Sequence, residues 1–295
     1  MCNPGMDRGV RAMPAILILP AAELPMICIG KQRLTCGKAW RAPGSTIGVG
    51  VSYFSLAERV PEVSAVDPRA LTWAYATICH VPLVRTAHRR FVEGALAQGV
   101  QQGLGLDLGT GPGYVAVEIA RQRPELRMVG LDLAAHMAER ACRLAARTRL
   151  NGRGLWPQAD GHRLPFANGT FDLVVSSFAL HHWADPVQIL NEVARVLKPD
   201  GRYYIADLCR DVTAFQRLFA YASIPVVSLP FGSYLGYGGY YESVRAGYTR
   251  AEARALLERS ALAAGDVRYA GSWFVPIFTI TSCEEARPRD DTAGL

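Results

Sequence analysis

Apolar residues follow two alternating periods from residue 103 onward, and this alternation predicts an α/β fold. Short apolar runs typical of buried strands occupy residues 104–108, 127–133, 155–158, 172–178 and 202–207. Helical periodicity marks the stretches between them, at residues 115–123, 135–150 and 186–197. Strands separated by helices of this length indicate crossover connections, so we expect a doubly wound, mostly parallel sheet with helices on both faces.

Turn and capping signals refine this prediction near the carboxyl end. Pro199, Asp200 and Gly201 predict a turn that leads into the strand at 202–207. Thr249 and Glu252 have the spacing of a capping box, which predicts a helix to about residue 263. Residues 267–282 then predict two strands joined by a turn.

Composition divides the chain into further segments. Residues 1–66 are rich in proline and lack a persistent period, so we expect a poorly structured extension, a targeting segment or a start at a later methionine. Helical signals at 67–102 predict a lid, and 103–211 form the core. An aromatic, glycine-rich insertion follows at 212–247, the core resumes at 248–285, and a flexible tail covers 286–295.

Charge and cysteine content exclude several classes of protein. Half of the 295 residues are apolar, which excludes a disordered chain, and the net charge of +6 comes almost entirely from arginine and is weak evidence for nucleic-acid binding. The seven cysteines lack zinc-site spacing, so we expect no metal site and a reducing, cytoplasmic compartment. The apolar run at 14–30 is interrupted by Pro20, Glu23 and Pro25, so we expect no membrane span.

The most informative stretch is the glycine loop Leu106-Asp107-Leu108-Gly109-Thr110-Gly111-Pro112-Gly113. It follows a strand and opens a helix, where glycines let a ligand approach the main chain closely. A dinucleotide fingerprint would have its third glycine at position 114, which is Tyr114 here. The spacing therefore favours a ligand with an amino-acid tail, whose ammonium could donate a hydrogen bond to Asp107.

Two acids follow the next two strands. Asp132 can accept hydrogen bonds from a ribose diol, and it can equally cap the following helix. Asp160 can accept from the exocyclic amine of an adenine, or it can be a solvated turn residue.

Together with the glycine loop, the motifs Gly130-Leu131-Asp132, Ala159-Asp160-Gly161, Leu164-Pro165-Phe166, His181-His182 and Glu192 to Gly201 give the chain a family resemblance. It resembles class I S-adenosylmethionine-dependent methyltransferases, above all the small-molecule group related to ubiquinone and menaquinone C-methyltransferases. The resemblance implies a Rossmann-like sheet of seven strands with a reversed last strand. Asp200 and Ala135 are small departures from the family pattern.

The resemblance also implies which residues bind S-adenosyl-L-methionine. The methionine end would lie at the glycine loop, Asp132 would hold the ribose, and Leu133, Met137, Asp160 and Gly161 would border the adenine. Ser177 and Phe178 would flank the cofactor and open toward the acceptor. The implied cofactor-binding residues are Asp107, Gly109, Thr110, Gly111, Gly113, Asp132, Leu133, Met137, Asp160, Gly161, Ser177 and Phe178.

The implied reaction is metal-independent, in-line transfer of a methyl group to a small, partly apolar acceptor. Because a sulfonium methyl is already activated, the protein must mainly align donor and acceptor and exclude water. The insertion at 212–247 and the lid could enclose the site, and Tyr75 of the lid could lie near the cofactor carboxylate. Alternatively, the insertion could be a packed subdomain or the surface of a homodimer. His181 or His182 could act as a base, or could serve packing alone.

Three other functions stay open on the sequence. They are a non-catalytic protein that binds S-adenosylmethionine, a dinucleotide-dependent oxidoreductase and a nucleic-acid methyltransferase. Tyr114 disfavours the oxidoreductase. An Asn-Pro-Pro-Tyr motif, typical of nucleic-acid enzymes, is missing after the fourth strand, where the chain reads Ser177-Phe178-Ala179-Leu180. The acceptor atom and the oligomeric state do not follow from the sequence.

Overall fold

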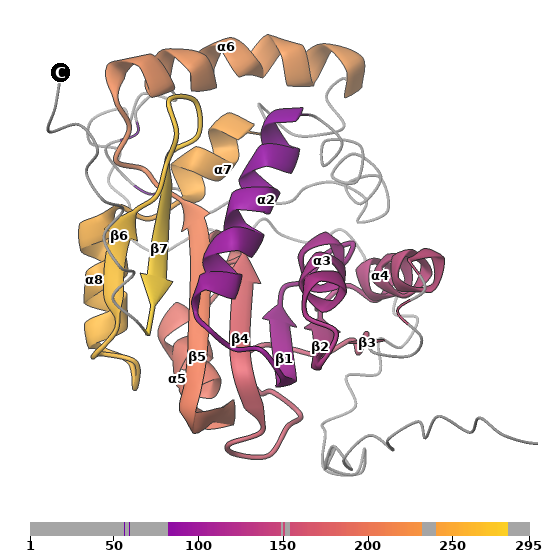
Figure 1. Cartoon of the computed structure of the whole chain (residues 1–295). Helices are drawn as coiled ribbons and strands as arrows, with labels where there is room; N and C mark the ends of the chain where they lie inside the picture. Colours follow the sequence, from indigo (N-terminus) through magenta and orange to yellow (C-terminus); the bar gives the residue numbers. More distant parts are fainter. Residues whose placement is uncertain are drawn as a thin grey trace, which may run out of the picture.

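A computed structural model describes Leu56, Arg59 and residues 82–148, 150, 154–231 and 240–282 of the chain. The described part is built on a seven-stranded sheet in the order β3-β2-β1-β4-β5-β7-β6 (Figure 1). The strands are β1 (Gly103–Leu108), β2 (Leu126–Leu131), β3 (Gly154–Leu155), β4 (Phe171–Ser177), β5 (Leu197–Leu208), β6 (Asp266–Tyr269) and β7 (Ile277–Thr281). β1 to β5 pair in parallel, and β7 runs antiparallel to both β5 and β6. The predicted doubly wound sheet with a reversed last strand is therefore confirmed.

Helices cover both faces of this sheet (Figure 1). α2 (Pro82–Ala97), α3 (Tyr114–Gln122) and α4 (Ala135–Arg147) pack on one face, and α5 (Pro186–Val196) and α8 (Arg250–Glu258) pack on the other. α6 (Ala214–Phe231) crosses the edge of the molecule toward which β1, β4 and β5 point, and α7 (Tyr240–Ala246) lies beneath it (Figure 1). A short 3-10 helix, η2 (Leu180–His182), follows β4.

Strand periodicity separates two cores. In β4, Val174 packs with the α5 and α8 face, whereas Leu173 and Val175 pack with the α2, α3 and α4 face. In β5, Ile205 packs with the α5 and α8 face, and Ala206 packs with the α2, α3 and α4 face. Because successive strand side chains point to opposite faces, a run that is apolar at every position fits a strand buried on both sides.

Helix starts follow from local capping. The Asp185 side chain accepts a hydrogen bond from Gln188 N at the start of α5, and Pro186 occupies the first turn. Thr249 and Glu252 form the predicted capping box of α8. α8 ends at Glu258, earlier than the predicted residue 263.

The turn predicted at Pro199–Gly201 is a disruption within β5. Phe171 of β4 pairs with Leu197, and Leu173 pairs with Arg202, so residues 198–201 oppose only one residue of β4. The residues that predicted a turn therefore form a large bulge within β5. Because of this bulge, β5 begins directly where α5 ends.

Two residues of the predicted extension contact the core. Leu56 is buried in a cluster with Leu208 and Tyr241. Arg59 donates from Nε to Ala246 O at 2.7 Å and from Nη2 to His181 O at 2.9 Å. Tyr75 and the rest of the predicted lid before Pro82 lie outside the described residues, and the segment boundaries stay predictions.

Core packing gives a stability prediction. Leu190 on α5 is fully buried between helix and sheet, so Leu190→Ala should lower the free energy of unfolding by about 2–5 kcal/mol through lost burial and a cavity. Leu218→Ala on α6, where the side chain is 65% exposed, is the matched control and should change it by less than about 0.5 kcal/mol. Chemical denaturation of both variants measures the difference, and equal losses would contradict this description of the core.

Candidate functional site

The candidate site lies where the chain reverses its direction across the sheet. β1 pairs with β2 on one side and with β4 on the other, so the loops after these strands meet at one edge. Ser176 Oγ donates to Leu108 O at 2.7 Å and fixes the ends of β4 and β1 together. Ligands of open α/β sheets bind outside the carboxyl ends of the strands at such a position.

The glycine loop joins β1 to α3 in a conformation that requires glycine. Gly109, Gly111 and Gly113 have φ values of 74°, 53° and 85°, in the left-handed region. A Cβ at Gly109 would lie 2.6 Å from the Cβ of Ala179, and one at Gly113 would lie 2.7 Å from that of Ala141. The predicted loop is therefore tightly packed against neighbouring elements as well as tightly turned.

Asp107 is a buried acid with one unused oxygen. Its Oδ2 accepts a hydrogen bond from Thr110 Oγ1 at 2.7 Å, whereas its buried Oδ1 accepts none from the described residues. Desolvation raises the pKa of Asp107 to about 7, although the Thr110 hydrogen bond opposes the rise. A cation placed at Oδ1 would satisfy this oxygen and favour its charge.

Ser177 supplies a second unused oxygen at the same place. Its Oγ is buried and has no hydrogen-bond partner within the described part of the chain. Both groups line a cavity of about 20 Å³ next to the glycine loop, and its lining residues are His88, Asp107, Gly109, Thr110, Pro112, Tyr114, Val115 and Ser177. Two buried polar atoms that border one space of this size indicate a place for a polar group, either of a ligand or of a water molecule.

His88 is a site residue that the sequence analysis missed. Its ring lies 6.4 Å from that of Tyr114 and 6.0 Å from that of Phe178, between centroids. Desolvation lowers its pKa to about 4, so the ring is neutral near pH 7. The signal that could have found it is the helical spacing of His88 to the buried Phe91 and Ala95 on α2.

Asp132 connects the loops after β1 and β2. Its Oδ2 accepts a hydrogen bond from Gly111 N at 2.8 Å, and its Oδ1 accepts one from Ala134 N at 2.9 Å. Desolvation raises its pKa despite these bonds. Beside it, the Leu133 side chain is 68% exposed, and Met137 is partly buried. A carboxylate and an exposed apolar side chain thus stand together at this edge.

Asp160 is held by His162 on the loop after β3. Its Oδ1 accepts a hydrogen bond from His162 N at 2.9 Å and lies 2.6 Å from His162 Nδ1. Burial opposes ionisation here, but these two contacts prevail and lower the pKa of Asp160. His162 Nε2 accepts from Asp185 N at 3.2 Å, which places the proton of a neutral ring on Nδ1. Gly161 is partly buried next to Asp160.

The two candidate bases lie in different surroundings. His181 is buried, and its Nδ1 lies 2.6 Å from Oδ1 of the fully buried Asp207, whose Oδ2 accepts from His181 N at 2.6 Å. His182 is exposed, and its ring centroid lies 4.0 Å from that of His181. Although the residue is exposed, desolvation by the surrounding protein and the neighbouring His181 lower the pKa of His182.

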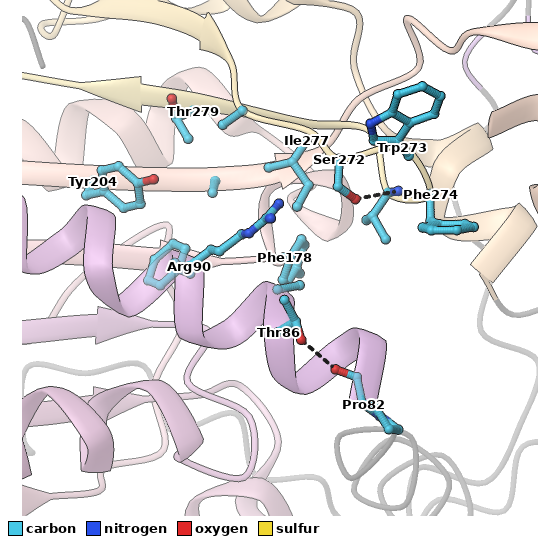
Figure 2. Close-up of a pocket in the computed structure, with 15 residues that line it drawn as sticks. Pro82, Thr86, Arg90, Phe178, Tyr204, Ser272, Trp273, Phe274, Ile277 and Thr279 are labelled. Carbon is cyan, nitrogen blue, oxygen red and sulfur yellow. Dashed lines mark hydrogen bonds between the residues drawn. The ribbon is translucent and has the colours of Figure 1, made fainter. Parts of the chain in front are cut away.

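Phe178 separates the glycine-loop cavity from a larger one. Its φ of 53° is the only positive value among non-glycine residues of the described chain, and its N donates to Ala206 O at 2.9 Å. Beyond it lies a cavity of about 480 Å³ between α2 and the strands β5 and β7 (Figure 2). Phe178 therefore forms a wall of this larger space.

Within the described ranges of the chain, no three His, Cys, Asp or Glu side chains are grouped so that they could hold a metal ion. No helix in the same ranges has the length and hydropathy needed to cross a bilayer.

Comparisons with known proteins agree with this geometry. A family model described as a methyltransferase domain matches residues 106–205. The ubiquinone/menaquinone biosynthesis C-methyltransferase UbiE of Desulfotalea psychrophila is 38% identical over 128 residues, which are 42% of this chain and 47% of that protein. A malonyl-acyl-carrier-protein O-methyltransferase of Legionella pneumophila is 37% identical over 98 residues, which are 32% of this chain and 33% of that protein.

The fold is also found in solved structures. A Methanococcus maripaludis protein assigned as an S-adenosyl-L-methionine-dependent methyltransferase matches with a TM-score of 0.54 and 20% identity, over 72% of this chain and 90% of that one. The chain spans about half the length of the UbiE relative that it matches.

The buried Asp107 leads to a pH-dependent stability prediction. Because its pKa is raised to about 7 in the folded state, its ionisation costs stability as the pH rises from about 4 to 7, and the cost is complete above 7. Asp107→Asn should therefore raise the free energy of unfolding by about 2–4 kcal/mol at pH 8 and change it little at pH 4.5. Urea denaturation at both pH values measures this, and an equal effect at the two would contradict it.

Proposed function

We propose that residues 106–205 form a methyltransferase domain of the class I S-adenosylmethionine-dependent type, and that the protein transfers a methyl group from S-adenosyl-L-methionine to a small-molecule acceptor. The observation that carries the proposal is the pair of unpartnered buried oxygens, Asp107 Oδ1 and Ser177 Oγ, beside the glycine loop. The amino-acid tail of the donor offers an ammonium and a carboxylate that these two groups can bind.

The adenosine end of the donor fits the next two loops. Asp132 retains acceptor capacity on both oxygens after its two backbone hydrogen bonds, so it can also accept from a ribose diol. Leu133 and Met137 would contact one face of the adenine. Asp160, kept ionised and oriented by His162, would accept from the adenine amine next to Gly161.

When bound, the donor would supply an activated methyl group. A lone pair of the acceptor would form the new bond to the methyl carbon, and the electrons of the broken C–S bond would stay on sulfur. The residues of this chain have to align the reactants at about 3–3.5 Å and exclude water. Ser177 and Phe178 stand between the two cavities, which suits that task. No step of this scheme requires a metal ion.

The two histidines suit different roles. We propose that His181 is a positioning residue, because Asp207 and Arg59 hold its ring, its backbone N–H and its carbonyl. His182 is the better candidate for a base because it is accessible to solvent and neutral near pH 7. Its lowered pKa makes it a weak base, which suits an acceptor that is already acidic.

Further parts of the proposal concern the surroundings of the site. The predicted lid at 67–102 and the insertion at 212–247 would cover a partly apolar acceptor, and the insertion could also form the surface of a homodimer. Two free thiols, on Cys142 and Cys209, occur in the described chain and suit a cytoplasmic enzyme. The family match favours methyl transfer over a dinucleotide-dependent reaction or a purely binding role.

Calorimetry and mass spectrometry test the function. The purified protein should bind S-adenosyl-L-methionine and its demethylated product, and it should transfer a deuterated methyl group to a component of a metabolite extract. Asp132→Asn should weaken donor binding about tenfold or more, because a hydrogen bond to a charged group is lost. Asp200→Asn, at an exposed residue near the amino end of β5 and away from the candidate site, is the control. The absence of donor binding would refute the proposal, and binding without transfer to any extract would favour a binding protein.

His182 can be tested separately once an acceptor is known. If it takes the acceptor proton, His182→Ala should lower kcat about 10²-fold or more with little change in KM for the donor. Glu258→Ala, an exposed residue at the end of α8 and outside the candidate site, is the control. An unchanged kcat at saturating acceptor would remove His182 from the proton-transfer step.

A further inference from the structure

The cavity beyond Phe178 has the size and the walls of a small-molecule site. Its volume of about 480 Å³ lies within the range of about 300–1,000 Å³ that is typical of ligand pockets. It opens between α2, the ends of β5 and β7, and the residues that join β6 to β7 (Figure 2). Its apolar lining residues include Phe91, Phe178, Ala206, Phe274, Val275 and Ile277.

One charged side chain reaches into this apolar space. Of the described residues that line the cavity, Arg90 alone carries a charge. Figure 2 shows its guanidinium extending from α2 into the space bounded by Ile277 and Phe178. No carboxylate lines the cavity in the described chain, so nothing there offsets the positive charge.

Arg90 differs in this respect from its neighbour on α2. Arg89 Nε lies 3.6 Å from Glu93 Oε1, one helical turn away. Arg90 has no ion pair or hydrogen bond to any residue within the described ranges, and it stays accessible to solvent. Its five N–H donors are therefore free for a ligand.

We propose that this cavity is the acceptor site and that it takes an aromatic or alicyclic acid whose carboxylate pairs with Arg90; this inference rests on the proposed methyl transfer. A guanidinium binds a planar carboxylate through two parallel hydrogen bonds, and such charge-assisted pairs are stronger than hydrogen bonds between neutral groups. The aromatic and aliphatic walls contact the ring of the same molecule. Phe178 places this ligand next to the glycine-loop cavity, where the methyl donor would lie.

Matched acids and amides test the proposal. Benzoate, phenylacetate and cinnamate are titrated into the full-length protein saturated with S-adenosylhomocysteine, and benzamide, phenylacetamide and cinnamamide serve as neutral counterparts. At least one acid should bind about tenfold more tightly than its amide. Arg90→Gln should remove this preference and leave amide binding within about twofold. Arg90→Lys keeps the positive charge but lacks the two parallel N–H donors of a guanidinium, so it should retain part of the preference for the acid.

Arg89→Gln is the control on the adjacent position and should leave every affinity unchanged. Equal affinity of each acid and its amide would overturn the proposal, as would a preference that survives Arg90→Gln or the absence of any acid binding. S-adenosylhomocysteine is first titrated alone into each variant, so failure of the cofactor site is distinguished from failure of the acid site. Circular dichroism of each variant verifies that it folds.

Discussion

The carboxylate of Asp132 fixes the positions of two loops relative to each other. Asp132 accepts a hydrogen bond from Gly111 in the loop after β1 and another from Ala134 at the start of α4. The glycine loop therefore has a fixed position relative to the loop after β2, and the small cavity beside Asp107 depends on that position. The same carboxylate stands at the edge where we expect a ribose, so one side chain both shapes the site and faces its ligand.

Two buried acids of the sheet differ in how completely their carboxylate oxygens are hydrogen-bonded. Asp207 is fully buried, and its two oxygens accept hydrogen bonds from His181 N, Leu208 N and the His181 ring. Asp107 is equally enclosed, yet one of its oxygens has no donor among the described residues. The first arrangement stabilises a loop, because every polar atom is satisfied. The arrangement at Asp107 leaves a buried oxygen without a hydrogen bond, which lowers the stability of the protein without ligand. A cationic ligand can offset this loss, as is common at binding sites.

Local signals in the sequence predicted most of the fold. The apolar run at β4 and the capping residues Thr249 and Glu252 act through neighbours close in the chain, and the structure confirms them. The bulge in β5 was predicted as a turn, because its effect depends on which strand lies beside it. Helical spacing could have placed His88 with the buried Phe91 and Ala95, but nothing local in the sequence tells that His88 and Arg90 border cavities. The predicted glycine-loop residues do meet around one small cavity, whereas their contacts with a cofactor stay a proposal.

Arg59 has a consequence for the way the protein can be divided. Its guanidinium bridges the carbonyls of His181 and Ala246 and lies 4.2 Å over the ring of Tyr248. It comes from a stretch well before the matched methyltransferase domain. A fragment trimmed to that domain would lack both Arg59 and Ala246, and the carbonyl of His181 would lose its hydrogen bond from the guanidinium. The folded unit thus extends beyond the segment matched by the family model, and recombinant fragments should retain Leu56 and Arg59.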